Sequence, residues 1–301
     1  MHLVDLEHDG LPGAIGVWVL EEPEPTLVDP GPSTSLERLE AGLDALGLPL
    51  GEVRHLLLTH VHLDHAGASG QLAARNPRLT VHVHEDGAVH MADPEKLVAS
   101  TRRTFGDAHD RLWGEVLPVP ADQIRGWAPG VSSPLPGIRP IPTPGHIAHH
   151  LAWEAERMGM LFAGDALGIL LHPEAPTHPA TPPPAVDLKA WRETLSETLD
   201  PVEVEAFGVT HFGLHADLEG RRKALLEALD ALALRVDRAM REGPEAEEAD
   251  REAFHEESIG KAAPHLPEGR ARHYFETFPA RGDWDGMRFH LDRTPAARPP
   301  R

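Results

Sequence analysis

The feature that most constrains this chain is a histidine-rich run that directly follows a short apolar segment. The run reads Thr59-His60-Val61-His62-Leu63-Asp64-His65 and carries three imidazoles and one carboxylate within six positions. Side chains alternate along an extended segment, so His60 and His62 point the same way, while the turn that follows can aim Asp64 and His65 toward a neighbouring point. The spacing therefore predicts two adjacent metal positions that share one loop at the end of a strand.

The chain contains no cysteine, so a metal site must be built from nitrogen and oxygen donors. Neutral imidazoles with a carboxylate suit zinc, iron or manganese, and a catalytic ion needs about three protein ligands and a position for water. Three later segments each offer one more donor at an expected strand end, namely His146 after Pro144-Gly145, Asp165 after Gly164, and His211 after Thr210. Together these segments supply enough donors for two ions.

The alternation of apolar stretches and helical spacing predicts an α/β fold. Short β-branched stretches predict strands at 15–20, 26–28, 55–59, 80–84, 138–141, 150–154, 160–163 and 204–209. Apolar residues at three- and four-residue intervals predict helices at 33–46, 65–75, 94–105, 108–116, 188–199 and 218–241. We expect a catalytic domain at 1–215, in which 88–136 forms a helical insertion over the site, and a mainly helical C-terminal region at 216–301.

Charge and apolar run length narrow the classes of function. The chain has 28 Lys and Arg against 48 Asp and Glu, a formal net charge of -20, and such a field repels a phosphate backbone. The longest apolar runs are far too short to cross a bilayer. We therefore expect a cytoplasmic protein with a small-molecule substrate, no nucleic-acid partner and no membrane. The sequence leaves the oligomeric state open, a homodimer included.

As an ordered set, the motifs resemble those of the metallo-β-lactamase superfamily. The matching features are the HxHxDH run, the PGH at His146, the GD at Asp165 and the late His211, over about residues 1–215. The resemblance implies a four-layer αββα sandwich. It also implies that the first ion is held by His60, His62 and His146, the second by Asp64, His65 and His211, and that Asp165 bridges the two.

Within that superfamily the chain looks most similar to glyoxalase-II-like hydrolases, because Asp64 and His65 stand where common β-lactamases use a cysteine in the second ligand set. The resemblance also suggests supporting roles behind the ligands for Asp29, in Leu-Val-Asp-Pro-Gly, and for His150. For Asp29 a plain strand-ending turn is the alternative interpretation. His82, His84, His90, His149 and His215 are interpreted as structural histidines.

The expected reaction is hydrolysis of a small acyl substrate, that is a thioester, ester or lactone, with two divalent ions, zinc being favoured over iron or manganese. A water shared between the ions would be acidified to a bridging hydroxide, which Asp64, the expected catalytic residue, would orient. Two alternatives stay open: a phosphodiesterase or nuclease of the same superfamily, and a mononuclear-iron oxidoreductase similar to persulfide dioxygenases. Phe105, Trp113 and Trp127 are expected to line either a substrate pocket or a small core.

Overall fold

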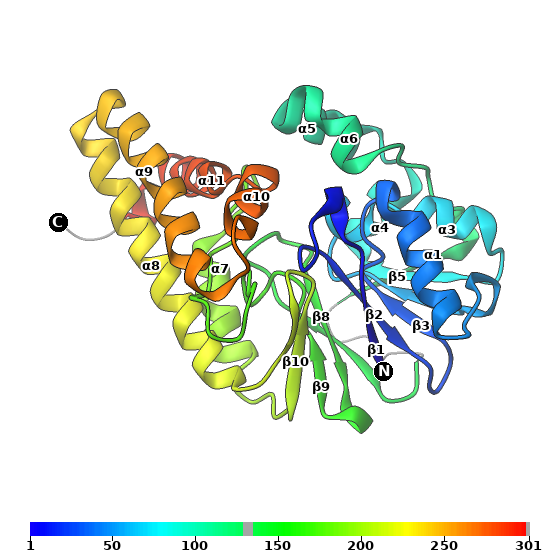
Figure 1. The fold of residues 1–301 in the computed structure, drawn as a ribbon. Helices are drawn as coiled ribbons and strands as arrows, with labels where there is room; N and C mark the ends of the chain where they lie inside the picture. Colours follow the sequence, from blue (N-terminus) through cyan, green and yellow to red (C-terminus); the bar gives the residue numbers. More distant parts are fainter. Residues whose placement is uncertain (129–134, 299–301) are drawn as a thin grey trace.

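The computed structural model describes residues 1–128 and 135–298, and in them two β-sheets face each other between layers of helices (Figure 1). The first sheet has the order β1-β2-β3-β4-β5-β6. Its first three strands pair antiparallel, and the pairs from β3 to β6 are parallel. The strands are β1 His2–Asp5, β2 Gly16–Leu20, β3 Thr26–Val28, β4 His55–Leu57, β5 Thr80–His84 and β6 Ile124–Trp127.

The second sheet has the order β11-β10-β9-β8-β7, and only β9 and β10 pair in parallel. Large apolar side chains fill the space between the two sheets, among them Trp18 and Leu57 from the first and Trp153 and Phe162 from the second. This arrangement is the expected αββα sandwich. The strands are β7 Ile138–Pro142, β8 Leu151–Ala155, β9 Met160–Phe162, β10 Ala206–Val209 and β11 Gly213–His215.

Amphipathic helices cover the outer face of the first sheet (Figure 1). They are α1 Leu36–Ala45, α3 Ser69–Arg75 and α4 Glu85–Ala92. Helix α1 buries Leu36, Leu39 and Leu43, which recur at the spacing that places them on one side of the helix. The predicted helix at 65–75 is divided, because the four-residue helix α2, Leu63–Ala66, precedes α3.

The C-terminal helices lie on the far side of the second sheet, beside α7 Leu188–Glu193 (Figure 1). Buried residues of these helices, such as Leu225 and Met287, belong to the same hydrophobic cluster as Phe207 and Leu161 of the second sheet. The C-terminal region therefore shares a core with the sandwich. It consists of α8 Leu218–Glu242, α9 Pro244–Ala262, α10 Arg270–Thr277 and α11 Ala280–Arg293.

Two strands were not expected from the sequence. The range 88–136 contains both predicted helices, as α5 Glu95–Phe105 and α6 His109–Trp113, but it also contains β6, which pairs with β5 at the edge of the first sheet. Residues 129–134 of this range lie outside the described part of the chain. The strand at 204–209 is not the last one either, because β11 follows it. Every helix in the described ranges is too short or too polar to span a bilayer.

Candidate metal centre

All seven predicted ligands lie at one edge of the sandwich. His60 and His62 follow β4, and Asp64 and His65 lie in α2 directly after them. Asp165 follows β9, and His211 follows β10. His146 lies in the loop between β7 and β8. The ends of four segments that are far apart in the sequence therefore converge on one place.

Three imidazoles form a first group. The Nε2 atoms of His60 and His146 each lie 2.9 Å from Nδ1 of His62. His60 and His146 are buried, and His62 is only partly exposed. Three ring nitrogens that face one another this closely, with no carboxylate among them, are the arrangement expected around a shared cation.

Asp64, His65 and His211 form a second group. Oδ2 of Asp64 lies 3.1 Å from Nε2 of His211 and 3.7 Å from Nε2 of His65. Asp165 lies between the groups, because its Oδ1 is 3.3 Å from Nε2 of His65 and its Oδ2 is 3.5 Å from Nε2 of His146. One carboxylate thus faces both clusters, as the resemblance implied for a bridging ligand.

Hydrogen bonds behind the histidines fix which ring nitrogen faces the centre. Nδ1 of His146 donates to the carbonyl of Ala180, and Nδ1 of His211 donates to the carbonyl of Ala14, each at 2.8 Å. Nδ1 of His65 lies 2.8 Å from Oδ2 of Asp29. A ring that carries its proton on Nδ1 presents the lone pair of Nε2, which is the form that binds a metal.

The donor set passes a further test of fit. Nε2 of His65 and Oδ1 of Asp165 are buried and lie 3.3 Å apart, but neither makes a well-aligned hydrogen bond to any described residue. Leaving a polar atom buried and unpaired costs about 1–3 kcal/mol. A divalent cation between these atoms would satisfy both, so the residues fit the two ions that the sequence predicts.

Asp29 and His150 lie behind the ligands. Asp29 accepts hydrogen bonds from the backbone and hydroxyl of Thr59 and from the hydroxyl of Thr210, besides its contact with His65. It thereby connects the ends of β3, β4 and β10. Nε2 of His150 accepts the backbone N–H of Asp165 at 3.2 Å, so its Nδ1–H donates to Thr143.

Glycine is required just before Asp165. Gly164 has a φ of +49°, and a Cβ there would lie 2.5 Å from the hydroxyl oxygen of Thr59 and 2.9 Å from Nε2 of His150. Any other residue would push apart the groups that support the ligands. This close approach explains the Gly-Asp pair in the sequence.

Burial and neighbouring charges set the protonation states around the centre. Burial lowers the pKa of His62 to about 3, and it also holds the pKa of His60 well below the ordinary value. For His65, burial lowers the pKa, but the carboxylates of Asp165, Asp64 and Asp29 outweigh it and raise the pKa. Burial raises the pKa of Asp64, but His65 and His211 outweigh it, so Asp64 stays ionised.

Two residues near the centre were missed by the sequence analysis. Tyr274, the only tyrosine in the chain, is 1% exposed, and its ring centroid lies 6.3 Å from that of His211. Its hydroxyl has no hydrogen-bond partner among the described residues, and burial together with Asp165 and Asp64 holds its pKa well above the ordinary value. His8 is also buried with Nε2 unpaired, and burial lowers its pKa to about 4 although Asp64 raises it.

Aromatic side chains from distant segments surround these two residues. Trp113 of α6 stacks on His8 at 5.5 Å, and Phe278 lies 6.0 Å from Trp113 and 5.3 Å from His211, measured between ring centroids. Trp113 also packs with Leu63, so it belongs to a small core. Trp127 lies in the cluster between the sheets, and Phe105 packs against Trp113.

The chain thus has the two features of a class of metal-binding proteins. These are an αββα sandwich and groups of histidine and aspartate at one edge of it. Residues 12–211 match the family model described as the metallo-beta-lactamase superfamily, and this chain belongs to that superfamily. A curated relative, the uncharacterized protein YobT of Bacillus subtilis, is 29% identical over 148 residues. That match covers 49% of this chain and 59% of the relative, so it spans less than two thirds of the relative's length.

Solved structures share the fold at low identity. The metallo-beta-lactamase family protein TTHA1429 from Thermus thermophilus aligns with a TM-score of 0.64 and 23% identity, covering 98% of this chain and 93% of that one. The protein TTHA1623, solved in a di-iron-bound form, aligns with a TM-score of 0.52 and 24% identity, covering 69% and 93%. The first likeness extends over the C-terminal helices as well as the sandwich.

Proposed function

We propose that this chain is a metal-dependent hydrolase that acts on a small acyl substrate, namely a thioester, an ester or a lactone. The observation that carries the proposal is the position of Asp165, whose two carboxylate oxygens face different groups of histidines. A single ion, even one held by two histidines and this carboxylate, would use only one side of it and would leave the other group of donors without a metal. The arrangement therefore favours a dinuclear centre over the single-iron alternative.

Two divalent ions bound here would supply Lewis acidity and lower the pKa of water enough for it to act as a nucleophile at neutral pH. Five imidazoles and two carboxylates suit zinc, and they also suit iron or manganese. The di-iron-bound relative TTHA1623 supports a dinuclear occupancy and keeps iron open. We favour zinc, because the donor set without cysteine already matches its usual nitrogen and oxygen ligands.

Asp64 is the residue that we expect to handle protons. Its side chain is 18% exposed, whereas those of His65 and His211 are 0% and 2% exposed, so Asp64 is the member of its group that a substrate can reach. Its carboxylate stays ionised beside these histidines. It can therefore accept a hydrogen bond from the attacking water and pass a proton to the leaving group.

We expect Tyr274 and His8 to contact the substrate once its binding displaces Phe278, whose ring centroid lies 5.0 Å from that of Tyr274 and 6.0 Å from that of His8. Each is buried beside the centre with an unpaired polar atom, the hydroxyl of Tyr274 and Nε2 of His8. A hydroxyl that donates to the carbonyl oxygen of an acyl group would stabilise the negative charge that develops there. The hydroxyl of Tyr274 stays protonated, and so able to donate, because its pKa is raised.

An acyl substrate is favoured over a polyanion by charge. The formal net charge of -20 opposes a phosphodiester backbone, and a small neutral or singly charged ester meets much less repulsion. A thiolate leaves readily with little proton assistance, so thioesters should react well. A glyoxalase-II-like substrate preference, a cytoplasmic location and the absence of a nucleic-acid partner remain proposals.

The test is a kinetic comparison of glutathione thioesters, aryl esters, lactones and bis-aryl phosphodiesters with the metal-loaded protein. We expect at least one acyl class to give the highest kcat/KM. Asp64→Ala should lower that value by about 100-fold or more, because general acid-base assistance is worth about that much. Phosphodiesters that turn over with higher kcat/KM than every acyl substrate would overturn the preference.

A further inference from the structure

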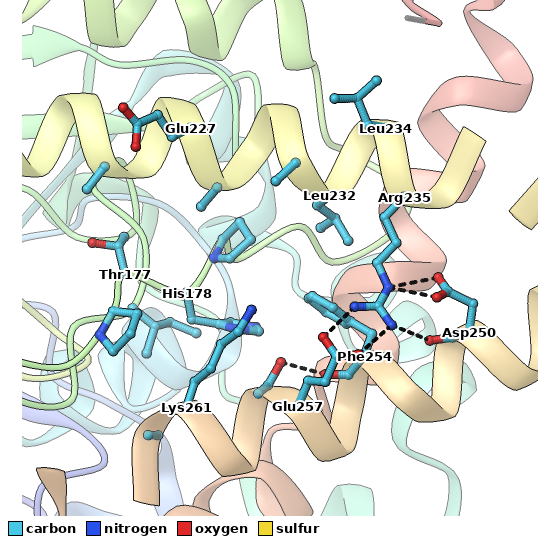
Figure 2. Close-up of a pocket in the computed structure, with 18 of the residues that line it drawn as sticks. Thr177, His178, Glu227, Leu232, Leu234, Arg235, Asp250, Phe254, Glu257 and Lys261 are labelled. Atoms are coloured by element: carbon cyan, nitrogen blue, oxygen red, sulfur yellow. Dashed lines mark hydrogen bonds and ion pairs between the residues drawn. The ribbon is translucent and has the colours of Figure 1, made fainter. Parts of the chain in front are cut away.

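A large cavity lies away from the candidate centre, between α8, α9 and the segment 169–179 (Figure 2). It measures about 1110 Å³. Its prominent cation, Arg235, is neutralised by ion pairs with Asp250 and Glu257. Thr177 and Lys261 lie at one end of this groove-shaped cavity (Figure 2). At that end, the segment that follows Asp165 meets the end of α9.

Three side chains with metal-binding atoms meet beside that end of the groove. His172 and Glu174 belong to the segment after Asp165, and His265 lies in the single turn Ala263–His265 after α9. One ligand atom from each residue lies within 4.8 Å of the others. The rings of His172 and His265 stack with centroids 6.1 Å apart and an angle of 25° between their planes.

The backbone that carries His172 and Glu174 is held in place. Arg221 of α8 donates hydrogen bonds to the carbonyls of Pro173 and Ala175, on either side of Glu174. A backbone hydrogen bond of 3.0 Å from the amide of Ala175 to the carbonyl of His172 closes a turn between them. Two of the three donors are thus presented on an ordered turn, which lowers the entropic cost of binding a ligand.

The three side chains have no competing side-chain partner in the described parts of the chain. Glu174 and His265 make no side-chain hydrogen bond or ion pair there, and His172 only accepts the amide of Glu174 at Nδ1, at 3.2 Å. A metal bound at Nε2 of His172 would move the ring proton to Nδ1 and replace this long bond, a small cost beside a metal–nitrogen bond.

We propose that His172, Glu174 and His265 bind one divalent transition-metal ion of the Zn²⁺ type, separate from the candidate centre. Two imidazoles with one carboxylate favour Zn²⁺, Co²⁺, Ni²⁺ or Cu²⁺ and disfavour Mg²⁺ and Ca²⁺, which prefer oxygen. Donors on one ion at bonds of about 2.1 Å lie at most about 4.2 Å apart, so small side-chain rotations suffice. Water would complete the coordination.

The proposed ion would join two parts of the molecule that both lead to the candidate centre. His172 lies in the segment that follows Asp165. His265 precedes α10, which carries Tyr274. The ion would therefore hold α10 against the segment after Asp165. This inference concerns binding alone and does not depend on the reaction proposed above.

The test is calorimetric titration of tag-free protein, already loaded at the candidate centre, with ZnCl₂. We expect one further equivalent of Zn²⁺ to bind the wild type, and this equivalent to be lost in His172→Ala and in His265→Ala. Glu174→Gln should weaken its binding by about 10-fold, since it removes the anionic ligand but keeps its shape. His273→Ala is the matched control, because His273 is a partly buried histidine of α10 outside the cluster.

A second readout is thermal unfolding of the same four variants and the wild type. Zn²⁺ at about 100-fold over its Kd should raise the Tm of the wild type and of His273→Ala by several degrees more than that of His172→Ala. The proposal is wrong if the loaded wild type binds no further equivalent. It is equally wrong if His172→Ala and His265→Ala bind that equivalent as tightly as the wild type does.

Discussion

At the scale of single residues, the candidate centre depends on groups that never touch an ion. Asp29 holds the Nδ1 side of His65 and at the same time binds Thr59 and Thr210. His150 holds the backbone of Asp165 from behind. These contacts fix the direction in which each donor points before anything binds. That preorganisation is why four loops can present one site.

Tyr274 gives the sharpest test at this scale. Its hydroxyl is buried without a partner, so Tyr274→Phe should leave the free energy of unfolding unchanged or raise it, because an unpaired buried hydroxyl costs about 1–3 kcal/mol. The same change should lower kcat by about 10-fold with little effect on KM if the hydroxyl acts mainly in the transition state. Urea unfolding and steady-state kinetics on the best acyl substrate measure the two effects. Reduced stability with unchanged kinetics would show that the hydroxyl is structural.

At the scale of elements, α6 lies beside the centre as packed core and not as an open pocket wall. Trp113 is 2% exposed and packs with Leu112 and with Leu63, which stands between His62 and Asp64. Trp113→Ala should therefore lower the free energy of unfolding by about 3–5 kcal/mol, as expected for a buried tryptophan. Chemical denaturation measures this. Wild-type stability combined with altered substrate selectivity would instead favour a role in substrate binding.

The edge of the first sheet should make stability depend on pH. His82 of β5 accepts a hydrogen bond from Nε1 of Trp127 in β6, and burial lowers its pKa from 6.5 to about 3. The unfolded chain binds a proton at His82 below pH 6.5, whereas the folded chain binds one only near pH 3. The stability that neutral His82 contributes is therefore fully present above pH 6.5 and is lost as the pH falls toward 3. His82→Leu should reduce the slope of unfolding free energy against pH in this window by up to about 1.4 kcal/mol per unit. An unchanged slope would mean that His82 is protonated in the folded state.

Local sequence patterns predicted some elements well and others not at all. The strands at Thr26–Val28 and Thr80–His84 have the predicted bounds, because each is a β-branched run closed by a turn. Strand β6 was missed because Arg125 and Gly126 in its middle are exposed and break the apolar pattern. It is specified by pairing with β5, which no local signal records.

The same limit applies to the candidate site. The predicted ligands are brought together in the structure because each follows a strand whose end could be recognised. Tyr274 and His8 lie near His211 and Asp64 through packing of α10 and of the N-terminal loop, over long separations in the sequence. Only the fact that the chain has a single tyrosine could have drawn attention to Tyr274.

At the scale of the whole molecule, the two halves of the chain are joined at the centre. The sandwich supplies all seven candidate ligands, and the C-terminal helices supply Tyr274, with Phe278 directly after α10. The helices share the hydrophobic cluster of the second sheet, so the position of Tyr274 relative to His211 is set by the common core. We expect substrate preference to depend on these helices more than metal binding does.

The most direct test of the central claim is elemental analysis of the metal bound per chain. It is measured in a His172→Ala background, so that the separate site proposed at His172, Glu174 and His265 does not contribute. The account predicts about two transition-metal ions per chain, because Asp165 lies between two groups of three donors. Adding Asp165→Ala should reduce the occupancy of both positions together. Occupancy near zero in the metal-replete protein, or two ions that remain fully bound after Asp165→Ala, would contradict it.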